Sequence, residues 1–120
     1  MATVEVTRDS FDATVAGDGI VLLDFWAQWC GPCRMFGPIF ERVSERHPDI
    51  VFGKVDTESE QELAAAFSIS SIPTLMAVRE RVVLHARPGA LPEAALEDLI
   101  TRVREVDMDE VRRKLAERTE

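Results

Sequence analysis

The chain has 120 residues, the size of one domain and long enough to bury a hydrophobic core without disulfide cross-links. Apolar residues make up 46% and charged residues 30%, the balance of a folded globular protein and not of a disordered segment. The net charge of −8 disfavours binding to nucleic acid, and no apolar run reaches the roughly 18 residues that a membrane span requires.

The first half of the chain alternates between expected strands and helices. Residues 3–7 alternate in polarity as a short strand does, and residues 9–16 follow as a helix. The apolar run at residues 20–27 is typical of a strand buried on both faces. A longer helix is expected over residues 30–46, with a kink at Pro38 because proline cannot donate the helical hydrogen bond.

The second half continues the pattern and adds a hairpin. Residues 50–55 are expected to form a strand, residues 58–67 a helix, and residues 74–78 and 82–86 two strands joined by a short turn. Residues 92–106 form an amphipathic helix, since their apolar side chains are spaced i, i+3, i+4, i+7 at Leu96, Leu99, Ile100 and Val103.

This order of elements predicts an α/β fold, with a central mixed sheet and helices on both of its faces. The tail beyond it carries Asp107 and Glu110 in the spacing of a capping box, and Val111 and Leu115 on a narrow apolar stripe. We therefore expect a domain over residues 1–106 and a C-terminal helical extension over 107–120, lightly packed or projecting into solvent.

The only two cysteines, Cys30 and Cys33, are three positions apart and allow three interpretations. A permanent cross-link is disfavoured, because so short a loop stabilises by only about 2 kcal/mol, against about 4.7 kcal/mol for 100 residues. Zinc is disfavoured because C-x-x-C is half of a site, while His47 and His85 are isolated in sequence. A reversible dithiol is favoured, and we expect no metal.

The dithiol lies where a strand is expected to end and a helix to begin. The N-terminus of a helix carries partial positive charge, which stabilises a thiolate and lowers its pKa. Cys30 comes first, beside an exposed loop, and is expected to attack; Cys33, one turn inward, is expected to resolve the intermediate. Gly31 permits close approach of another backbone, and Pro32 suits the first turn of a helix.

Asp24 is an acid inside the apolar strand that precedes the dithiol. Burial without a full partner raises the pKa of a carboxyl group toward neutrality, which suits a proton shuttle.

Several segments resemble the thioredoxin family, for which C-x-x-C near a βαβ pattern is a known sign. The matching spacing runs from about Thr3 to Arg104. The segments are Asp24-Phe25-Trp26-Ala27-Gln28-Trp29-Cys30-Gly31-Pro32-Cys33, Phe36-Gly37-Pro38, Lys54-Val55-Asp56, Ser71-Ile72-Pro73-Thr74 and Gly89-Ala90-Leu91.

The resemblance implies a thioredoxin fold of about five strands and a thiol-disulfide oxidoreductase that reduces client protein disulfides. It implies recycling by thioredoxin reductase, an NADPH-dependent flavoprotein, and no cofactor bound to the chain itself. Because no secretory signal is visible at the start, we expect a cytoplasmic protein, and we expect a monomer.

The resemblance also assigns roles to residues around the dithiol. It places Asp24 beneath the buried cysteine with Lys54 close by; the alternative is a structural ion pair with no catalytic part. It places a cis bond at Ile72-Pro73, which leaves the backbone of Ile72 free to pair with an extended client segment. The expected client-binding residues are Trp29, Gly31, Pro32, Ile72, Pro73 and Gly89, and Trp26 is expected to pack behind the site.

Two departures from the family pattern leave client choice and recognition by a standard reductase open. Arg79-Glu80-Arg81 replaces an Asn-Gly or Asp-Gly turn, so positive φ is costly and we expect a different turn or a local bulge. Arg87-Pro88 precedes Gly89, where an apolar β-branched residue is usual. A donor dedicated to one client, or an interaction module with incidental redox activity, are the alternatives to a general disulfide reductase.

Overall fold

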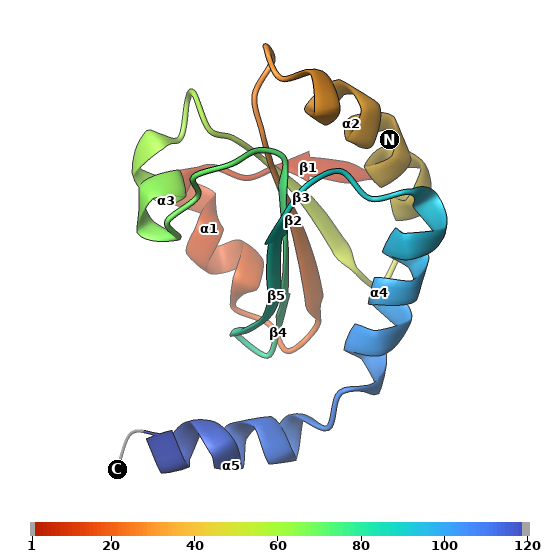
Figure 1. Ribbon diagram of the computed structural model, residues 1–120. Helices are drawn as coiled ribbons and strands as arrows, with labels where there is room; N and C mark the ends of the chain where they lie inside the picture. Colours follow the sequence, from red (N-terminus) through yellow and green to blue (C-terminus); the bar gives the residue numbers. More distant parts are fainter. Residues whose placement is uncertain (1, 119–120) are drawn as a thin grey trace.

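A computed structural model describes residues 2–118, and five strands there form one mixed sheet of order β1-β3-β2-β4-β5 (Figure 1). The first three strands in this order are parallel, whereas β4 runs antiparallel to both β2 and β5. The expected mixed sheet is confirmed. The strands are β1 (Thr3–Glu5), β2 (Ile20–Trp26), β3 (Val51–Asp56), β4 (Thr74–Arg79) and β5 (Val82–Pro88).

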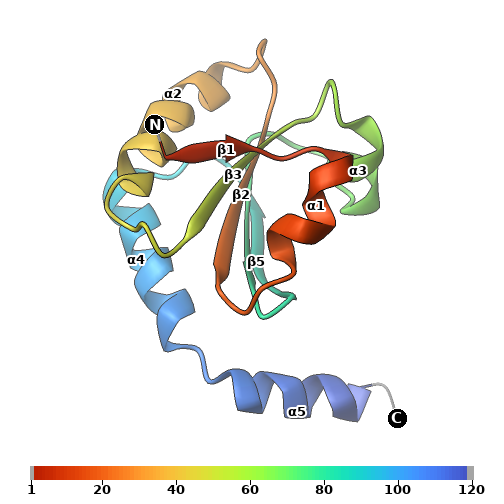
Figure 2. The same cartoon turned by 180° about the vertical axis from the view of Figure 1, so that it is seen from behind.

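Helices cover both faces of this sheet, as the order of elements predicts (Figures 1 and 2). On one face lie α1 (Arg8–Val15) and α3 (Gln61–Ala66), and on the other lie α2 (Gly31–Ser44) and α4 (Glu93–Glu105). Pro38 lies inside α2 without ending it. None of the helices in residues 2–118 is long and apolar enough to cross a membrane.

Strand β2 is buried on both faces, so its side chains alternate between two cores. Leu22 packs with Phe36 and Phe40 under α2, whereas Leu23 packs on the opposite face with Val55. By the same alternation, Asp24 points to the face that α2 covers. The apolar run thus carries a carboxyl group into the core beneath the helix that begins at the dithiol.

The turn between β4 and β5 has two residues with positive φ, Glu80 at 51° and Arg81 at 65°. The expectation of a different turn is therefore wrong. The expected bulge does occur, but earlier in the hairpin, where the register with β5 shifts between Ala77 and Val78. Positive φ costs a residue with a side chain roughly 1–2 kcal/mol, so the turn needs support from elsewhere.

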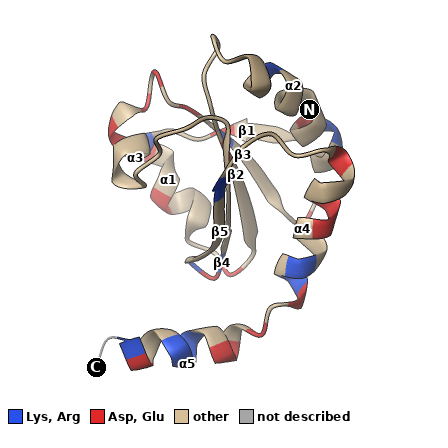
Figure 3. Ribbon diagram, in the orientation of Figure 1, with Lys and Arg blue, Asp and Glu red and all other residues tan. Residues whose placement is uncertain are grey.

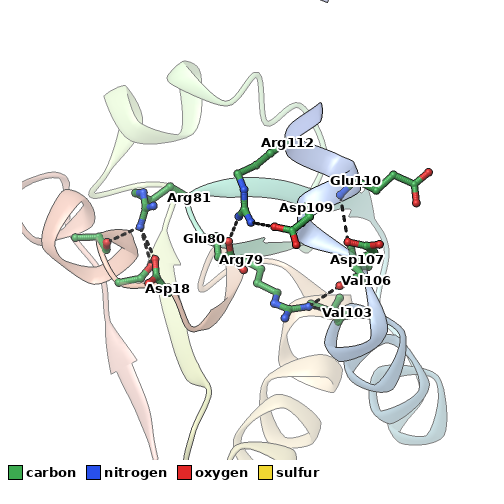
Figure 4. A network of polar contacts seen from close by, with 12 residues as sticks. Asp18, Arg79, Glu80, Arg81, Val103, Val106, Asp107, Asp109, Glu110 and Arg112 are labelled. Carbon is green, nitrogen blue, oxygen red and sulfur yellow. Dashed lines mark hydrogen bonds and ion pairs between the residues drawn. The ribbon is translucent and has the colours of Figure 1, made fainter. Parts of the chain in front are cut away.

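That support comes from the side chains of the turn, each of which holds a different neighbour (Figure 4). Arg81 donates to the carbonyl of Ala16 at 2.9 Å and pairs with Asp18 at 3.0 Å. Glu80 pairs with Arg112 near the C-terminus.

Arg79, just before the turn, caps the C-terminus of α4. Its guanidinium Nη1 donates to the carbonyl oxygens of Val103, Arg104 and Val106 at 3.0, 3.2 and 3.0 Å. The last carbonyls of a helix have no partner within the helix, so this single side chain satisfies groups that otherwise depend on water.

The expected extra helix is present as α5 (Met108–Arg118). The Asp107 carboxylate accepts a hydrogen bond from the amide of Glu110 at 3.1 Å, as an N-terminal cap does. Met108 is buried, whereas Leu115 is 39% exposed. Both cartoon views place α5 at the end of the molecule opposite the junction of β2 and α2 (Figures 1 and 2). The division of the chain at residue 106 stays a prediction.

Arg79→Ala should lower the free energy of unfolding by about 1–3 kcal/mol, because three carbonyls at the end of α4 lose a charged donor. Urea unfolding followed by circular dichroism measures the change. Arg102→Ala is the control, because it removes an exposed arginine of the same helix whose ion pair is with Asp98, four residues earlier. Equal stability of the two variants would contradict the capping role of Arg79.

Candidate active site

Cys30 is the N-cap residue of α2, and its sulfur is bonded to that of Cys33. Their Cα atoms are 5.2 Å apart, inside the range that a disulfide requires. The amide of Cys33 points at the Cys30 Sγ from 3.2 Å. The sulfur therefore lies where the helix presents unpaired amides and partial positive charge, which lowers the pKa of a cysteine thiol.

Burial of the cysteines themselves does not separate an attacking from a resolving sulfur. Cys30 is 3% exposed and Cys33 is 4% exposed in this oxidised form. Their sequence neighbours do not separate them either: Trp29 and Gly31 beside Cys30 are exposed, with Trp29 at 65%, and so are Pro32 and Arg34 beside Cys33. What distinguishes Cys30 is its position as the N-cap, with the amide of Cys33 aimed at its sulfur.

The loop before β4 meets the disulfide, and the residue after β5 bonds to that loop. The Ile72-Pro73 peptide bond is cis, as the resemblance implies, and the carbonyl oxygen of Ile72 lies 3.6 Å from the Cys30 Sγ. The amide of Gly89 donates to the carbonyl of Pro73 at 2.8 Å. Gly89 has a φ of 109°, which a residue with a side chain rarely adopts. Ile72, Pro73 and Gly89 are thus brought together beside Cys30.

Trp29 has a polar partner that the sequence analysis missed. Its indole Nε1 donates to the carboxylate of Glu58 at 3.2 Å, and the amide of Glu58 donates to Asp56 at 2.9 Å. These residues line a shallow pocket together with Gln28 and Arg34. Glu58 lies two residues after β3, the strand paired with β2, and the sequence analysis placed it only at the start of an expected helix over residues 58–67.

Asp24 is fully buried and has one polar partner. Its Oδ2 lies 3.3 Å from the Lys54 Nζ, whereas Oδ1 accepts no hydrogen bond from any residue in the described range 2–118. Burial raises the pKa of Asp24 above its ordinary value, and the ammonium group of Lys54 opposes this only in part.

A cleft beside the dithiol connects Lys54 to Cys33. Its walls are Trp26, Ala27, Gln28, Cys33, Arg34, Gly37 and Lys54. The Lys54 Nζ lies 5.2 Å from the centre of the Trp26 ring, and Trp26 also packs against the two cysteines. Lys54 thus contacts Asp24 on the buried side and reaches solvent through the cleft that Cys33 borders.

A redox-active cysteine pair at the N-terminus of a helix, facing a cis-proline loop in an α/β sheet, defines a thiol-disulfide oxidoreductase. Comparison with known proteins gives the family. The thioredoxin family model matches residues 2–102. A putative thioredoxin 2 of Streptomyces coelicolor is 62% identical over 116 residues, which are 97% of this chain and 87% of the relative. The chain belongs to the thioredoxin family.

Two further relatives are thioredoxins as well. The thioredoxin of Bacillus subtilis is 38% identical over 103 residues, covering 85% of this chain and 98% of its own length. The crystal structure of Malassezia sympodialis thioredoxin, described as a pan-allergen family member, has a TM-score of 0.76 at 33% identity, covering 85% of this chain and 91% of that one.

Asp24→Asn should stabilise the protein at neutral and alkaline pH. Because the folded-state pKa of Asp24 is raised, the folded protein binds more protons than the unfolded chain, and stability falls as pH rises through that pKa. Asparagine stays uncharged at every pH and removes this loss. The free energy of unfolding of the variant should therefore exceed that of wild type by on the order of 1–2 kcal/mol at high pH and equal it in acid. Urea unfolding from pH 4 to 9 measures the difference.

Asp98→Asn is the control for this experiment, because Asp98 is exposed on α4 and its exposed partner is Arg102. Its stability should follow the wild-type curve across the same range. A constant difference between Asp24→Asn and wild type at every pH would contradict a raised pKa at Asp24.

Proposed function

We propose that the protein reduces disulfide bonds of client proteins with Cys30 as the nucleophile and Cys33 as the resolving thiol. The observation that carries the assignment is the amide of Cys33 aimed at the Cys30 Sγ from 3.2 Å, because this donor and the helix N-terminus favour the thiolate at Cys30. The exposed neighbours of Cys30 give a bulky client its approach to that sulfur.

The reaction has two exchange steps. The Cys30 thiolate attacks one sulfur of the client disulfide, which forms a mixed disulfide and releases the other client sulfur as a thiolate that takes up a proton. The Cys33 thiolate then attacks the Cys30 Sγ, which releases the second client thiol and forms the Cys30–Cys33 disulfide. Two electrons pass to the client. We propose that NADPH-dependent thioredoxin reductase returns them, and that the protein works as a cytoplasmic monomer.

Asp24 is proposed to take the proton of Cys33 before the second step. Three observations support this: the raised pKa of Asp24, its position beneath α2, and its unpartnered oxygen Oδ1. Lys54 is proposed as a positioning residue that holds the carboxyl group through Oδ2 and connects it to the cleft at Cys33. The alternative role of Asp24 and Lys54 is a structural ion pair.

The client is proposed to bind across the disulfide as an extended segment. The backbone of Ile72 would pair with it beside the Cys30 Sγ, as an added strand pairs with a sheet edge. Trp29, Gly31 and Pro32 border this segment on one side of the sulfur. Pro73 and Gly89 border it on the other, joined by their 2.8 Å hydrogen bond. Trp26 supports the site from behind.

A donor dedicated to one client is the second candidate, and Pro88 is the observation that favours it. Pro88 is the last residue of β5, opposite Thr74 and directly before Gly89, so it alters the rim of the proposed client site. A general reductase would turn over many protein disulfides, whereas a dedicated donor would reduce few at a useful rate.

Cys33→Ser should accumulate mixed disulfides with client proteins, because the resolving thiol is absent and the adduct on Cys30 persists. Cys30→Ser should accumulate none. Non-reducing electrophoresis of each reduced variant mixed with a protein disulfide separates the adducts, and dithiothreitol should release them. Adducts formed only by Cys30→Ser would reverse the two roles.

Turnover of insulin with NADPH and a bacterial thioredoxin reductase tests the recycling route. A general reductase should consume NADPH in proportion to the insulin reduced. Activity with dithiothreitol but not with the reductase would favour a dedicated donor. Inactivity with both reductants would contradict the proposed function and leave an interaction module.

Asp24→Asn should slow the second exchange step about 10²-fold or more at pH 7, because general-base catalysis contributes roughly 10²–10⁴-fold. The amide oxygen can still accept a hydrogen bond from Lys54, so the variant removes the base and keeps that contact. Stopped-flow measurement of mixed-disulfide decay reports that step directly. An unchanged decay rate would leave the structural ion pair as the role of Asp24.

A further inference from the structure

Thr74, the first residue of β4, is one of three buried polar or charged residues in the described part of the chain. Its side chain is 6% exposed, and its hydroxyl Oγ1 donates to the carbonyl oxygen of Ser71 at 2.5 Å. A buried hydroxyl is usually hydrogen-bonded, but this bond also spans two residues of the proposed client site. Ile72 and Pro73 lie between its donor and its acceptor.

Strand pairing fixes the backbone of Thr74 on both sides. Thr74 lies opposite Phe25 of β2 and opposite Pro88 of β5. Directly opposed residues of antiparallel strands place their side chains on the same face of the sheet. The Thr74 side chain therefore points to the face where Phe25 packs in the buried cluster under α1 and α3. The sheet itself thus holds the hydroxyl in position.

The segment that carries Ser71 has no charged side chain to hold it. Residues 67–78, which follow α3 and include most of β4, contain no Lys, Arg, Asp or Glu, so the chain between α3 and β4 is tan in Figure 3. Pro73 has no amide hydrogen to donate. The position of this loop therefore depends on neutral contacts, among them the bond from Thr74 and the 2.8 Å bond from Gly89 to the Pro73 carbonyl.

The bond from Thr74 also sets the direction of the Ile72 amide. The Ser71 carbonyl and the Ile72 N–H belong to one peptide group, which is planar and rigid. A donor that holds the carbonyl therefore holds the N–H as well, pointing away from Thr74. The carbonyl of Ile72 lies 3.6 Å from the Cys30 Sγ, so this peptide group adjoins the attacking sulfur.

We propose that Thr74 is a positioning residue for client binding, which holds the peptide group between Ser71 and Ile72 so that the Ile72 amide can pair with the client segment. The proposal rests on the proposed function, because the client is the partner of that amide. Ser71 is exposed, so without the hydroxyl its carbonyl bonds to water and the peptide group rotates more freely. A client then has to order this group when it binds, which weakens binding.

The test uses the full-length protein in its reduced form without any reductase. One substrate is a synthetic peptide closed by a single disulfide. The other is 2-hydroxyethyl disulfide, which has no backbone to pair with Ile72. Tryptophan fluorescence follows oxidation and gives the second-order rate constant for each substrate. Thr74→Val removes the hydroxyl and keeps the branched shape, and Thr74→Ser keeps the hydroxyl. Thr74→Ala is a second variant without the hydroxyl, and circular dichroism checks that each variant is folded.

Thr14→Val is the matched control. The Thr14 hydroxyl donates to the carbonyl oxygen of Ser10 at 2.7 Å, so the variant loses the same kind of bond from a partly buried threonine. This bond lies within α1, on the face of the sheet opposite α2. The control therefore reports what the loss of such a bond does to the protein away from the dithiol.

Thr74→Val should react about fivefold more slowly than wild type with the peptide and at the wild-type rate with 2-hydroxyethyl disulfide. Thr74→Ser and Thr14→Val should match wild type with both substrates. An unchanged rate of Thr74→Val with the peptide would overturn the positioning role alone. Equal slowing with both substrates would place the effect on the dithiol and also overturn it.

The remaining outcomes separate positioning from a merely structural role. The same slowing in Thr74→Ser would assign the effect to the lost methyl group, and the same slowing in Thr14→Val would assign it to lost stability; either result overturns the proposal. Loss of folding in both Thr74→Val and Thr74→Ala would make Thr74 a residue of the fold and overturn it as well. Failure of wild type to react with either substrate would refute the proposed function itself.

Discussion

The active site depends on the register of three strands at Thr74. In the sheet, Thr74 lies opposite Phe25 of β2 and opposite Pro88 of β5. This alignment places the end of β2 beside Thr74, the residue that follows Pro73. The chain continues from the end of β2 to the dithiol. It also sets Gly89 against Pro73. Because a shift of one residue would turn every side chain of a strand to the other face, the buried β2 holds this register firmly.

The same register explains why Asp24 is tolerated in the core. Asp24 lies opposite Lys54 of the neighbouring parallel strand, and both side chains point toward the face under α2. The ion pair offsets part of the desolvation of the carboxyl group, but the pKa stays raised because burial outweighs one partner at 3.3 Å. A second partner on Oδ1 would lower that pKa further toward its ordinary value.

Local chemistry made most of the fold and the dithiol predictable. The apolar run of β2, the i, i+3 cysteines and the spacing of Leu96, Leu99 and Ile100 each indicate one structure, and the structure has all three. The turn at Glu80 and Arg81 was not predictable, because its support comes from Asp18 and Arg112, which are far away in sequence. The contact of Trp29 with Glu58 likewise joins two loops that only the pairing of β2 with β3 brings together.

The two ends of the molecule differ in the surroundings of their exposed side chains. At the turn end, Arg79 donates to the last carbonyls of α4 and Glu80 pairs with Arg112 of α5, so charged residues there serve the fold. At the dithiol end, Trp29 and Met35 stay exposed although burying them would stabilise the chain. Since α5 lies away from that end, the extension leaves the approach to Cys30 open while the hairpin holds it in place.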